Sequence, residues 1–315
     1  MAENKNLRVA VIGMGPVGSV LAAHFAKAGV YVVACDIIPE RMENIENSGI
    51  RLSNTIEFKT DVSDICTSID KLKTHDLDLA VVSVKTTANE KVMAQLSRIA
   101  SDKLYVLCAQ NGLDAEAEAV RVFGPEKAMR MVVNYAGGVE NNDLVNVTFF
   151  NPPNYVAALS PKSEEMVKTV TNLLNSANLK TEIPEDILFY VWEKVILNSS
   201  LSAMCAITGK TMKQVMDFDL SVEIVRGIID EGVAVAAKEN IKFREDFADF
   251  CIGYLKKAGH HRPSMWVDID AGAPTEVDYL NGKIVEYGLK HGISTPVNKT
   301  ITAQVHLMEL PDIGH

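Results

Sequence analysis

An apolar run near the N-terminus leads directly into three glycines with the spacing G-x-G-x-x-G. The run covers residues 7–12, and the glycines are Gly13, Gly15 and Gly18. In such a turn the first glycine allows the sharp exit from a strand, the second lets the backbone approach a pyrophosphate, and the third lets the next helix pack closely against the sheet. The spacing therefore predicts a strand, a phosphate-binding turn and a helix of a dinucleotide site.

The residues between these glycines favour the same interpretation. Pro16 suits the first turn of a helix, because a missing N–H costs nothing there and the φ of proline is already helical. The remaining N–H groups at that helix start would face the phosphates. We therefore expect the cofactor to contact the whole turn, which consists of Gly13, Met14, Gly15, Pro16, Val17 and Gly18.

A second apolar run, 31–35, ends at Asp36, about 20 residues after the glycine turn. An acid at this place accepts hydrogen bonds from the ribose hydroxyls of NAD, and its charge would repel the 2′-phosphate of NADP. NAD is therefore the expected cofactor, and NADP is the alternative, because Arg41 could reach toward a phosphate. Asp36 could instead simply cap the next helix, which is predicted over 39–47.

Composition argues against two classes of partner. The chain has 315 residues, 47% of them hydrophobic, and a formal net charge of −10 without a run of Lys or Arg, which argues against nucleic acid. Its longest apolar runs, such as 79–84, are strand-sized, and the N-terminus is too polar for a signal peptide. We expect a cytoplasmic protein that binds neither nucleic acid nor a membrane.

Cysteine and histidine spacing indicates neither disulfides nor a metal site. The five cysteines are widely separated and form no C-x-x-C pair, so reduced, buried thiols are expected. The seven histidines include the pair His260-His261 but no H-E-x-x-H pattern. No metal is predicted.

Strand-like and helix-like segments alternate through the first half of the chain. Strands are predicted at 7–12, 31–35, 77–84, 104–109 and 128–135, which is typical of a parallel, doubly wound sheet. Two further strands, 144–150 and 155–159, flank the turn 151–154, and we expect both as antiparallel additions at the sheet edge. A helix at 164–176 completes this part.

Helical spacing replaces the strands from about residue 184. The predicted helices cover 186–208, 212–218, 221–239, 247–258, 276–291 and 296–308. The expected fold class is α/β, with an N-terminal Rossmann-type doubly wound sheet in residues 1–183 followed by an all-helical C-terminal domain in residues 184–315. The first would bind the dinucleotide and the second the substrate, with the cleft at the carboxyl ends of the strands.

The long helix 186–208 carries a polar stripe. Lys194, Asn198 and Ser202 are spaced i, i+4 and i+8, so they share one side of an otherwise apolar helix. A lysine buried there would have its pKa pushed down toward neutrality, which suits a proton donor. The alternative is that Lys194 extends its amine to water along the helix surface. Periodicity does not decide between the two.

A second polar group lies at residues 264–282. Thr275 is a good N-cap residue, and with Asp278 three positions later it predicts a variant capping box, which would place Glu276 in the first turn of the helix. Acidic residues are common in first turns because they complement the helix dipole, so Glu276 also has a purely structural explanation. Ser264 could likewise be only a turn residue.

At this point the sequence resembles a known family, the ketopantoate reductases (2-dehydropantoate 2-reductases), over nearly its whole length. A lone G-x-G-x-x-G is shared by many dehydrogenases, but its combination with the other motifs is specific to this family. The matching residues are the glycines of the turn, Val84-Lys85, Gln110-Asn111-Gly112, Trp192-x-Lys194-x-x-x-Asn198, Ser264-Met265 and Thr275-Glu276-x-Asp278-x-Leu280-Asn281-Gly282.

The resemblance implies a role for each matching residue. Lys194 is expected to be the general acid that protonates the keto oxygen while hydride reaches the adjacent carbon. Asn111 is expected between nicotinamide and substrate, Asn198 at the substrate, and Ser264 at the substrate carboxylate. Glu276 is expected to orient groups near the lysine and to contact the cofactor. A further cofactor contact is expected from Lys85, and a further substrate contact from Ser202.

Three departures from the family pattern bear on substrate and cofactor. Ser202 stands where many members carry a second asparagine, and Asp36 stands where many carry a basic or neutral residue suited to NADPH. The segment 136–143 lacks a frequent Pro-Gly turn, which we interpret as a change in a surface loop.

Three functions therefore stay open. The expected activity is NAD(P)H-dependent reduction of a 2-keto acid to a D-2-hydroxy acid, with ketopantoate as the first candidate substrate. The first alternative is an NAD-dependent D-2-hydroxyacid dehydrogenase that acts on branched or aromatic 2-keto acids. The second is a nucleotide sensor without catalytic activity. The resemblance also makes a homodimer plausible.

Overall fold

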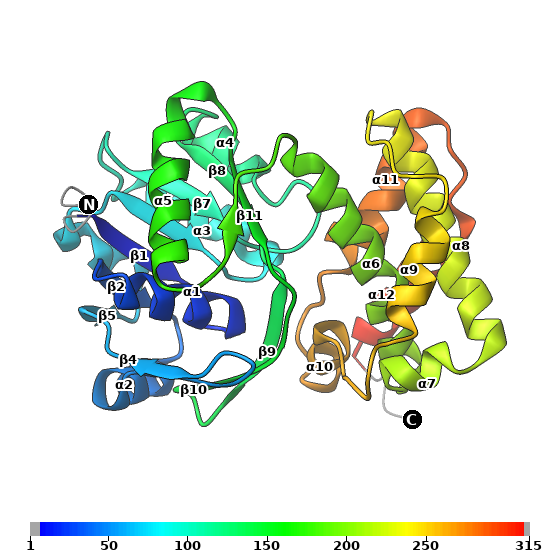
Figure 1. The fold of residues 1–315 in the computed structure, drawn as a ribbon, viewed down its shortest axis with the longest axis horizontal. Coiled ribbons are helices and arrows are strands. Elements are labelled where there is room, and N and C mark those ends of the chain that lie inside the picture. Colours follow the sequence, from blue (N-terminus) through cyan, green and yellow to red (C-terminus); the bar gives the residue numbers. More distant parts are fainter. Residues whose placement is uncertain (1–6, 312–315) are drawn as a thin grey trace. The chain divides into compact units, whose positions relative to one another are not determined.

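The computed structural model describes residues 7–311, and the chain divides into two compact units (Figure 1). One unit comprises Met1–Gln110 and Ala115–Ile187, and we call it the sheet unit. The other comprises Asn111–Asp114 and Leu188–His315, and we call it the helical unit. A four-residue segment therefore leaves the sheet unit after Gln110, joins the helical unit and returns.

An eight-stranded sheet forms the centre of the sheet unit, in the order β12-β11-β8-β7-β6-β1-β2-β5. The six strands from β8 to β5 run parallel, β11 is antiparallel to β8, and β12 is parallel to β11. The predicted doubly wound α/β fold is confirmed, although β5 and β12 have no counterpart in the sequence prediction. The strands are β1 (Arg8–Ile12), β2 (Tyr31–Cys35), β5 (Asp64–Cys66), β6 (Leu79–Val82), β7 (Tyr105–Cys108), β8 (Ala128–Val132), β11 (Asn154–Ala158) and β12 (Thr181–Glu182).

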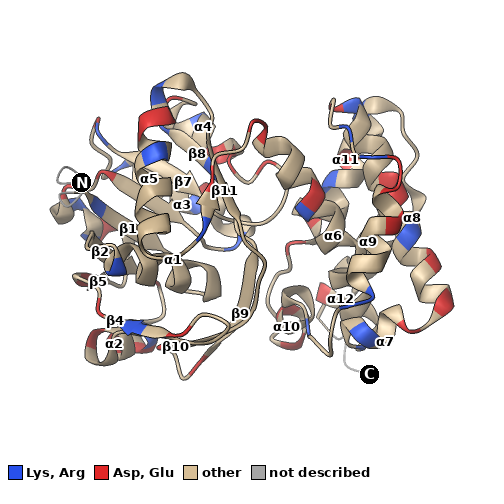
Figure 2. Cartoon of the chain, viewed as in Figure 1, with Lys and Arg blue, Asp and Glu red and all other residues tan. Residues whose placement is uncertain are grey.

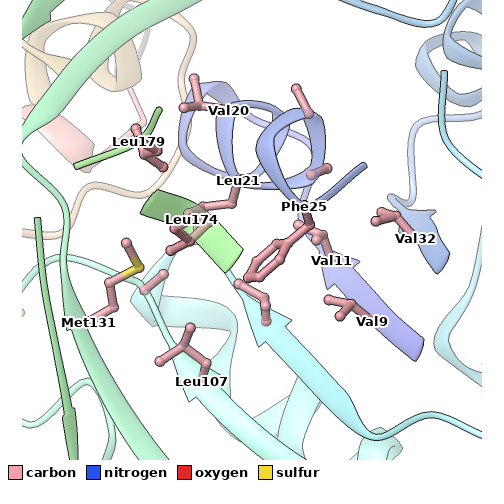
Figure 3. Close-up of a cluster of buried hydrophobic side chains, with 14 of the residues drawn as sticks. Val9, Val11, Val20, Leu21, Phe25, Val32, Leu107, Met131, Leu174 and Leu179 are labelled. Atoms are coloured by element: carbon pink, nitrogen blue, oxygen red, sulfur yellow. The ribbon is translucent and has the colours of Figure 1, made fainter. Parts of the chain in front are cut away.

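Helices cover both faces of this sheet, because alternate residues of a strand point to opposite layers. Val9 of β1 faces a core that includes Phe25 and Leu174 (Figure 3), whereas its neighbour Ala10 faces a second core that includes Met93. The helices are α1 (Pro16–Lys27), α2 (Pro39–Ser48), α3 (Asn89–Ser97), α4 (Ala117–Phe123) and α5 (Glu164–Ser176), with short 3₁₀ turns η2 (Ile69–His75), η3 (Thr86–Ala88) and η4 (Pro161–Ser163).

A second, four-stranded sheet lies in the same unit, in the order β4-β3-β10-β9. Its strands are β3 (Ile50–Asn54), β4 (Phe58–Thr60), β9 (Tyr135–Glu140) and β10 (Leu144–Phe150). The sequence prediction was wrong here, because β10 is not an edge strand of the main sheet and segment 136–143 is mostly strand rather than loop. A tight turn joins β9 to β10, in which Asn141 and Asn142 both have positive φ, a conformation that asparagine tolerates well.

The helical unit contains seven α-helices among its described residues; six correspond to predicted helices, and α10 (Ser264–Asp270) was not predicted. The other six are α6 (Ile187–Thr208), α7 (Met212–Met216), α8 (Asp219–Lys238), α9 (Phe247–Leu255), α11 (Asn281–His291) and α12 (Pro296–Glu309). The structure differs from the prediction at the start of the helix expected over 276–291. The helix expected to begin at Glu276 is a 3₁₀ turn, η5 (Val277–Tyr279), followed by α11.

The capping box predicted at Thr275 is also absent. The Thr275 hydroxyl accepts a hydrogen bond from the Val277 amide at 3.3 Å, but the Asp278 carboxylate contacts His306 of α12 instead of reaching back to Thr275. Leu280, with φ −112° and ψ −102°, separates the 3₁₀ turn from α11. Glu276 therefore precedes a 3₁₀ turn and does not occupy the first turn of the long helix.

The cysteines, the charged residues and the helix lengths each bear on an expectation from the sequence. All five cysteines are buried and unbridged, and burial raises the pKa of Cys35, Cys108, Cys205 and Cys251 to about 12, which favours the neutral thiol. Basic and acidic residues are interspersed over both units (Figure 2). Within residues 7–311, no three His, Cys, Asp or Glu side chains are grouped as metal ligands, and no helix has the length and apolarity to cross a bilayer.

Candidate active site

The glycine turn lies at the carboxyl end of β1, where the order of the strands reverses. β1 lies between β2 and β6. The chain adds β2 and β5 on one side of β1, and then β6, β7 and β8 on the other side. Gly13 has φ +94°, and its amide donates to the Cys35 carbonyl at 2.8 Å. In open parallel sheets, ligands bind at such a switch point. The location therefore suits the predicted dinucleotide.

The three glycines differ in the space around them. A Cβ on Gly18 would collide with the Gly13 carbonyl oxygen and lie 2.5 Å from the Ser83 hydroxyl, so this position needs glycine for packing. A Cβ on Gly15 would meet no atom within 4 Å. Gly15 is the N-cap of α1, and Pro16 follows at the first helical position. The open side of the turn is thus where a phosphate could approach the helix start, which fits a dinucleotide.

Ser83 holds this turn in place and was not singled out by the sequence. Its hydroxyl donates to the carbonyl oxygens of Ile12 and Gly13, at 3.1 and 2.9 Å, from the residue that follows β6. A serine after a buried strand gives little signal by itself, because its role appears only when β1 and β6 are known to be neighbours.

Asp36 is fixed by three neighbours at the end of β2. One carboxylate oxygen accepts from the Met14 amide at 2.7 Å, and the other from the Ile38 amide at 3.0 Å. The Arg41 guanidinium lies 3.5 Å from the first oxygen and donates to the Met14 carbonyl at 3.2 Å. Arg41 therefore contacts both the acid and the glycine turn. The structural alternative is also partly present, because Asp36 accepts from Ile38, which is the N-cap of α2.

Lys85 and Asn111 follow the next two parallel strands. Lys85 is exposed and immediately precedes η3 after β6. Asn111 is partly buried and comes three residues after β7, in the segment that belongs to the helical unit. Just before it, Gln110 is buried, and its carbonyl accepts from the Arg130 guanidinium at 2.7 Å. The carboxyl ends of β2, β1, β6 and β7 thus lead to Asp36, Gly13, Lys85 and, beyond Gln110, Asn111.

In the helical unit, α6 presents the predicted polar stripe on a buried helix. Trp192, Val195 and Ile196 are at most 3% exposed, so most of this helix lies inside the unit. Lys194 and Asn198 are only partly buried, and Ser202 is 8% exposed. The stripe therefore runs from two partly buried residues to a buried one along one side of α6.

A buried asparagine fixes the middle of α6. Asn281, at the start of α11, is fully buried, and its side-chain amide donates to the Ser199 carbonyl at 3.1 Å and to the Asn298 side chain at 3.0 Å. Asn298 in turn donates to Glu231 of α8 at 2.7 Å. Asn281 belongs to the T-E-x-D-x-L-N-G motif, so the motif was found from the sequence but this role was not.

Two further predicted residues lie in the same unit. Ser264 is exposed at the first position of α10, and Glu276 is partly buried at the N-cap of η5. Thr275, directly before Glu276, donates its amide to Glu309 of α12 at 2.8 Å. The helical unit therefore contains Asn111, Lys194, Asn198, Ser202, Ser264 and Glu276, while the glycine turn, Asp36 and Lys85 belong to the sheet unit.

Comparison with known proteins assigns both units to one family. The family described as ketopantoate reductase PanE/ApbA matches residues 9–159, and its C-terminal part matches residues 186–309. The chain belongs to the ketopantoate reductase family. A 2-dehydropantoate 2-reductase of Streptococcus pyogenes is 26% identical over 304 residues, which cover 96% of this chain and 97% of the relative. The predicted oxidoreductase class and family are confirmed.

Solved structures give the same fold for this ketopantoate reductase family member. A 2-dehydropantoate 2-reductase from Geobacter metallireducens matches with a TM-score of 0.86 and 21% identity, over 96% of this chain and 99% of the other. A D-mandelate dehydrogenase in complex with NADH and anilino(oxo)acetate matches with a TM-score of 0.84 and 23% identity, over 96% and 98% of the two chains. The same fold thus occurs in a protein named 2-dehydropantoate 2-reductase and in one named D-mandelate dehydrogenase.

Proposed function

We propose that this protein catalyses the NAD(P)H-dependent reduction of a 2-keto acid to a D-2-hydroxy acid, with ketopantoate as the first candidate substrate and pantoate as its product. The observation that carries the proposal is the pair Lys194 and Asn198, which share one partly buried side of α6, next to a face on which Val195 and Ile196 are at most 1% exposed. A helix of this kind places a cation and an amide at fixed positions for a small anionic substrate.

In the proposed reaction, Lys194 Nζ donates a proton to the keto oxygen while the carbonyl carbon is reduced. Negative charge develops on that oxygen, so a nearby ammonium first stabilises it and then neutralises it by proton transfer. Asn198 and Ser202 would hydrogen-bond the substrate, and the Ser264 hydroxyl would bind its carboxylate. Glu276 would orient the groups near Lys194. When bound, the nicotinamide supplies the hydride.

The two halves of the chain would divide the work. Residues 1–183 would form the dinucleotide-binding domain, in which the turn from Gly13 to Gly18 binds the phosphates and Lys85 makes a further contact. Residues 184–315 would form the helical substrate domain. Asn111 would lie between nicotinamide and substrate.

We also propose a homodimer. Sedimentation of the purified protein would test this.

NAD is the proposed cofactor, because Asp36 at the end of β2 suits the ribose hydroxyls of NAD and its charge would repel a 2′-phosphate. NADP is the alternative, because Arg41, 3.5 Å from Asp36, could contact a 2′-phosphate. We expect Asp36→Ala to weaken NADH binding, since it removes an acceptor for the ribose hydroxyls. The difference between the Michaelis constants for NADH and NADPH should become smaller, since the substitution also removes a charge that repels the 2′-phosphate. Michaelis constants for both cofactors would measure this. A wild type that prefers NADPH would contradict the assignment to Asp36.

A double variant separates the two effects of that substitution. In Asp36→Ala, the Arg41 guanidinium loses its carboxylate partner and becomes available to a 2′-phosphate. If Arg41 contributes to the improved use of NADPH, Asp36→Ala/Arg41→Leu should lose that improvement while NADH binding stays as weak as in Asp36→Ala. Equal use of NADPH by the single and double variants would show that only the charge of Asp36 matters.

A second candidate activity is NAD-dependent D-2-hydroxyacid dehydrogenase, and two residues favour it. Asp36 suits NAD, and Ser202 is smaller than the asparagine found in many ketopantoate reductases, which leaves more room for a branched or aromatic substrate. A panel of keto acids with both cofactors tests the choice. Oxidation of NADH with ketopantoate supports the first proposal, whereas turnover of phenylglyoxylate or 2-ketoisocaproate without ketopantoate turnover supports the second. No turnover of either class would contradict both.

A further inference from the structure

The segment Asn111–Asp114 is attached to the helical unit by its own backbone. The Leu113 amide donates to the Tyr279 carbonyl at 3.0 Å. Gly112 has φ +99°, and a Cβ there would lie 2.7 Å from the Tyr279 Cβ and 2.9 Å from its carbonyl oxygen. The close approach explains the glycine, because a larger residue would push the segment away from η5.

Asp114 adds two side-chain contacts from the same segment to α11. One carboxylate oxygen accepts from the Tyr287 hydroxyl at 2.9 Å, and the other lies 2.9 Å from Lys283 Nζ. The side chains of Lys283 and Asp114 are 17% and 33% exposed, so this ion pair is more enclosed than an ordinary surface pair. Asp114 itself has φ 57°, a conformation that aspartate and asparagine tolerate better than most residues.

Both partners keep the protonation state that these contacts need. Burial alone would lower the pKa of Lys283, but its bonds to Asp114 and Glu286 raise the pKa above its usual value, so the ammonium persists at neutral pH. Burial and the Asp114 carboxylate raise the pKa of Tyr287, so the phenol stays protonated and donates. The two bonds to Asp114 therefore persist at neutral pH.

Tyr287 and Tyr279 extend this attachment toward other candidate site residues. The ring of Tyr287 packs edge-on against Trp192 of α6, with ring centroids 5.5 Å apart, two residues before Lys194. The Tyr279 amide donates to the Glu276 carbonyl at 3.0 Å. The turn that holds Leu113 is thus the turn that begins at Glu276.

We propose that Asp114 is a positioning residue that fixes Asn111 by fastening the segment Asn111–Asp114 to α11, through Lys283 and Tyr287. The inference rests on the proposed function for the role of Asn111. Asn111 is only three residues from Asp114, and the intervening Leu113 is bonded to η5, so the Asp114 side chain and the Leu113 amide hold the same short segment. Small displacements of a reacting group lower turnover more than they lower binding.

Two substitutions at Asp114 and one at its partner test the proposal. Asp114→Asn keeps an acceptor for Tyr287 and tolerates the positive φ, but it loses the charge that attracts Lys283. Asp114→Ala loses both contacts and is strained at that φ, whereas Tyr287→Phe removes one hydroxyl and leaves residue 114 unchanged. Lys213→Met, which breaks an exposed pair with Asp217 on α7 in the same unit, is the matched control.

Hydrogen exchange and steady-state kinetics give separate readouts. We expect amide exchange at Leu113 to rise in all three test variants, and kcat to fall by about tenfold in Asp114→Ala, with smaller losses in Asp114→Asn and Tyr287→Phe. KM should change less than kcat, and Lys213→Met should match the wild type in both readouts. A kcat that is higher in Asp114→Asn than in Asp114→Ala would separate a positioning role of Asp114 from general destabilisation of the fold.

Two results would overturn the proposal. Unchanged exchange at Leu113 in Asp114→Ala would mean that the side chain does not fasten the segment. Faster exchange with kcat within about twofold of the wild type would mean that the fastening does not position Asn111. Failure of the proposed function is distinguishable, because it would appear as absent keto acid turnover in the wild type, while the exchange measurement needs no substrate.

Discussion

Replacement of Lys194 by alanine is expected to lower kcat by about two orders of magnitude or more, the usual scale for loss of a general acid. The reason is that the keto oxygen would lose both the charge that stabilises it and its proton source. The fold should survive, because the residues that bury α6 lie on its other faces, with Val195 and Ile196 at most 1% exposed. Cofactor affinity should be largely kept, since the glycine turn and Asp36 are in the other unit.

Steady-state oxidation of NADH, together with a direct titration of cofactor binding, would measure the two effects of Lys194→Ala separately. Lys194→Arg is the informative companion, because a guanidinium keeps the positive charge but does not release its proton at neutral pH. We expect Lys194→Arg to recover part of the loss at most. Unchanged turnover in Lys194→Ala would refute the role of Lys194.

The same pair of measurements separates an enzyme from a nucleotide sensor. A sensor needs the glycine turn but has no use for Lys194. If the wild type binds NADH and reduces no keto acid, and Lys194→Ala binds NADH equally well, the sensor hypothesis gains the support that the enzyme hypothesis loses.

Local sequence signals predicted those features whose cause is local. The glycine turn followed from three glycines and a proline, and α6 followed from apolar spacing that extends over 22 residues. The polar stripe on α6 needed only helical periodicity. The predicted boundaries for β2, β10 and α5 coincide with those in the structure, because turn residues or a change of periodicity mark both ends.

Features that depend on distant residues were missed or misplaced. Strand β10 has the same alternation wherever it pairs, so its sequence does not show that it joins β9 and β3 rather than the main sheet. The role of Asn281 requires α6, α11 and α12 to meet at one buried point. The segment Asn111–Asp114 follows a strand of the sheet unit, so its attachment to η5 and α11 has no local signature.

The second large effect is expected from glycine substitutions in the turn. Gly18→Ala should lower the stability of the fold, whereas Gly15→Ala should lower NADH affinity. Gly18→Ala places a Cβ against the Gly13 carbonyl and the Ser83 hydroxyl, and both belong to the tight junction of β1 and β6. The backbone has to move to relieve this contact. We expect the free energy of unfolding to fall by about 3 kcal/mol, at the upper end for overpacking, as measured by urea denaturation.

Gly15→Ala is the matched variant, because its Cβ meets no atom within 4 Å and its φ of −69° suits any residue. The free energy of unfolding should fall by only about 1 kcal/mol, which is the usual cost of alanine at an N-cap. A methyl group on the open side of the turn would nevertheless hinder a phosphate. Losing one hydrogen bond to a charged group costs about 1.5 kcal/mol or more, so NADH affinity should fall by about tenfold or more. Unchanged NADH affinity in a stable Gly15→Ala would show that the open side of the turn is not where the pyrophosphate binds, whatever the activity of the enzyme.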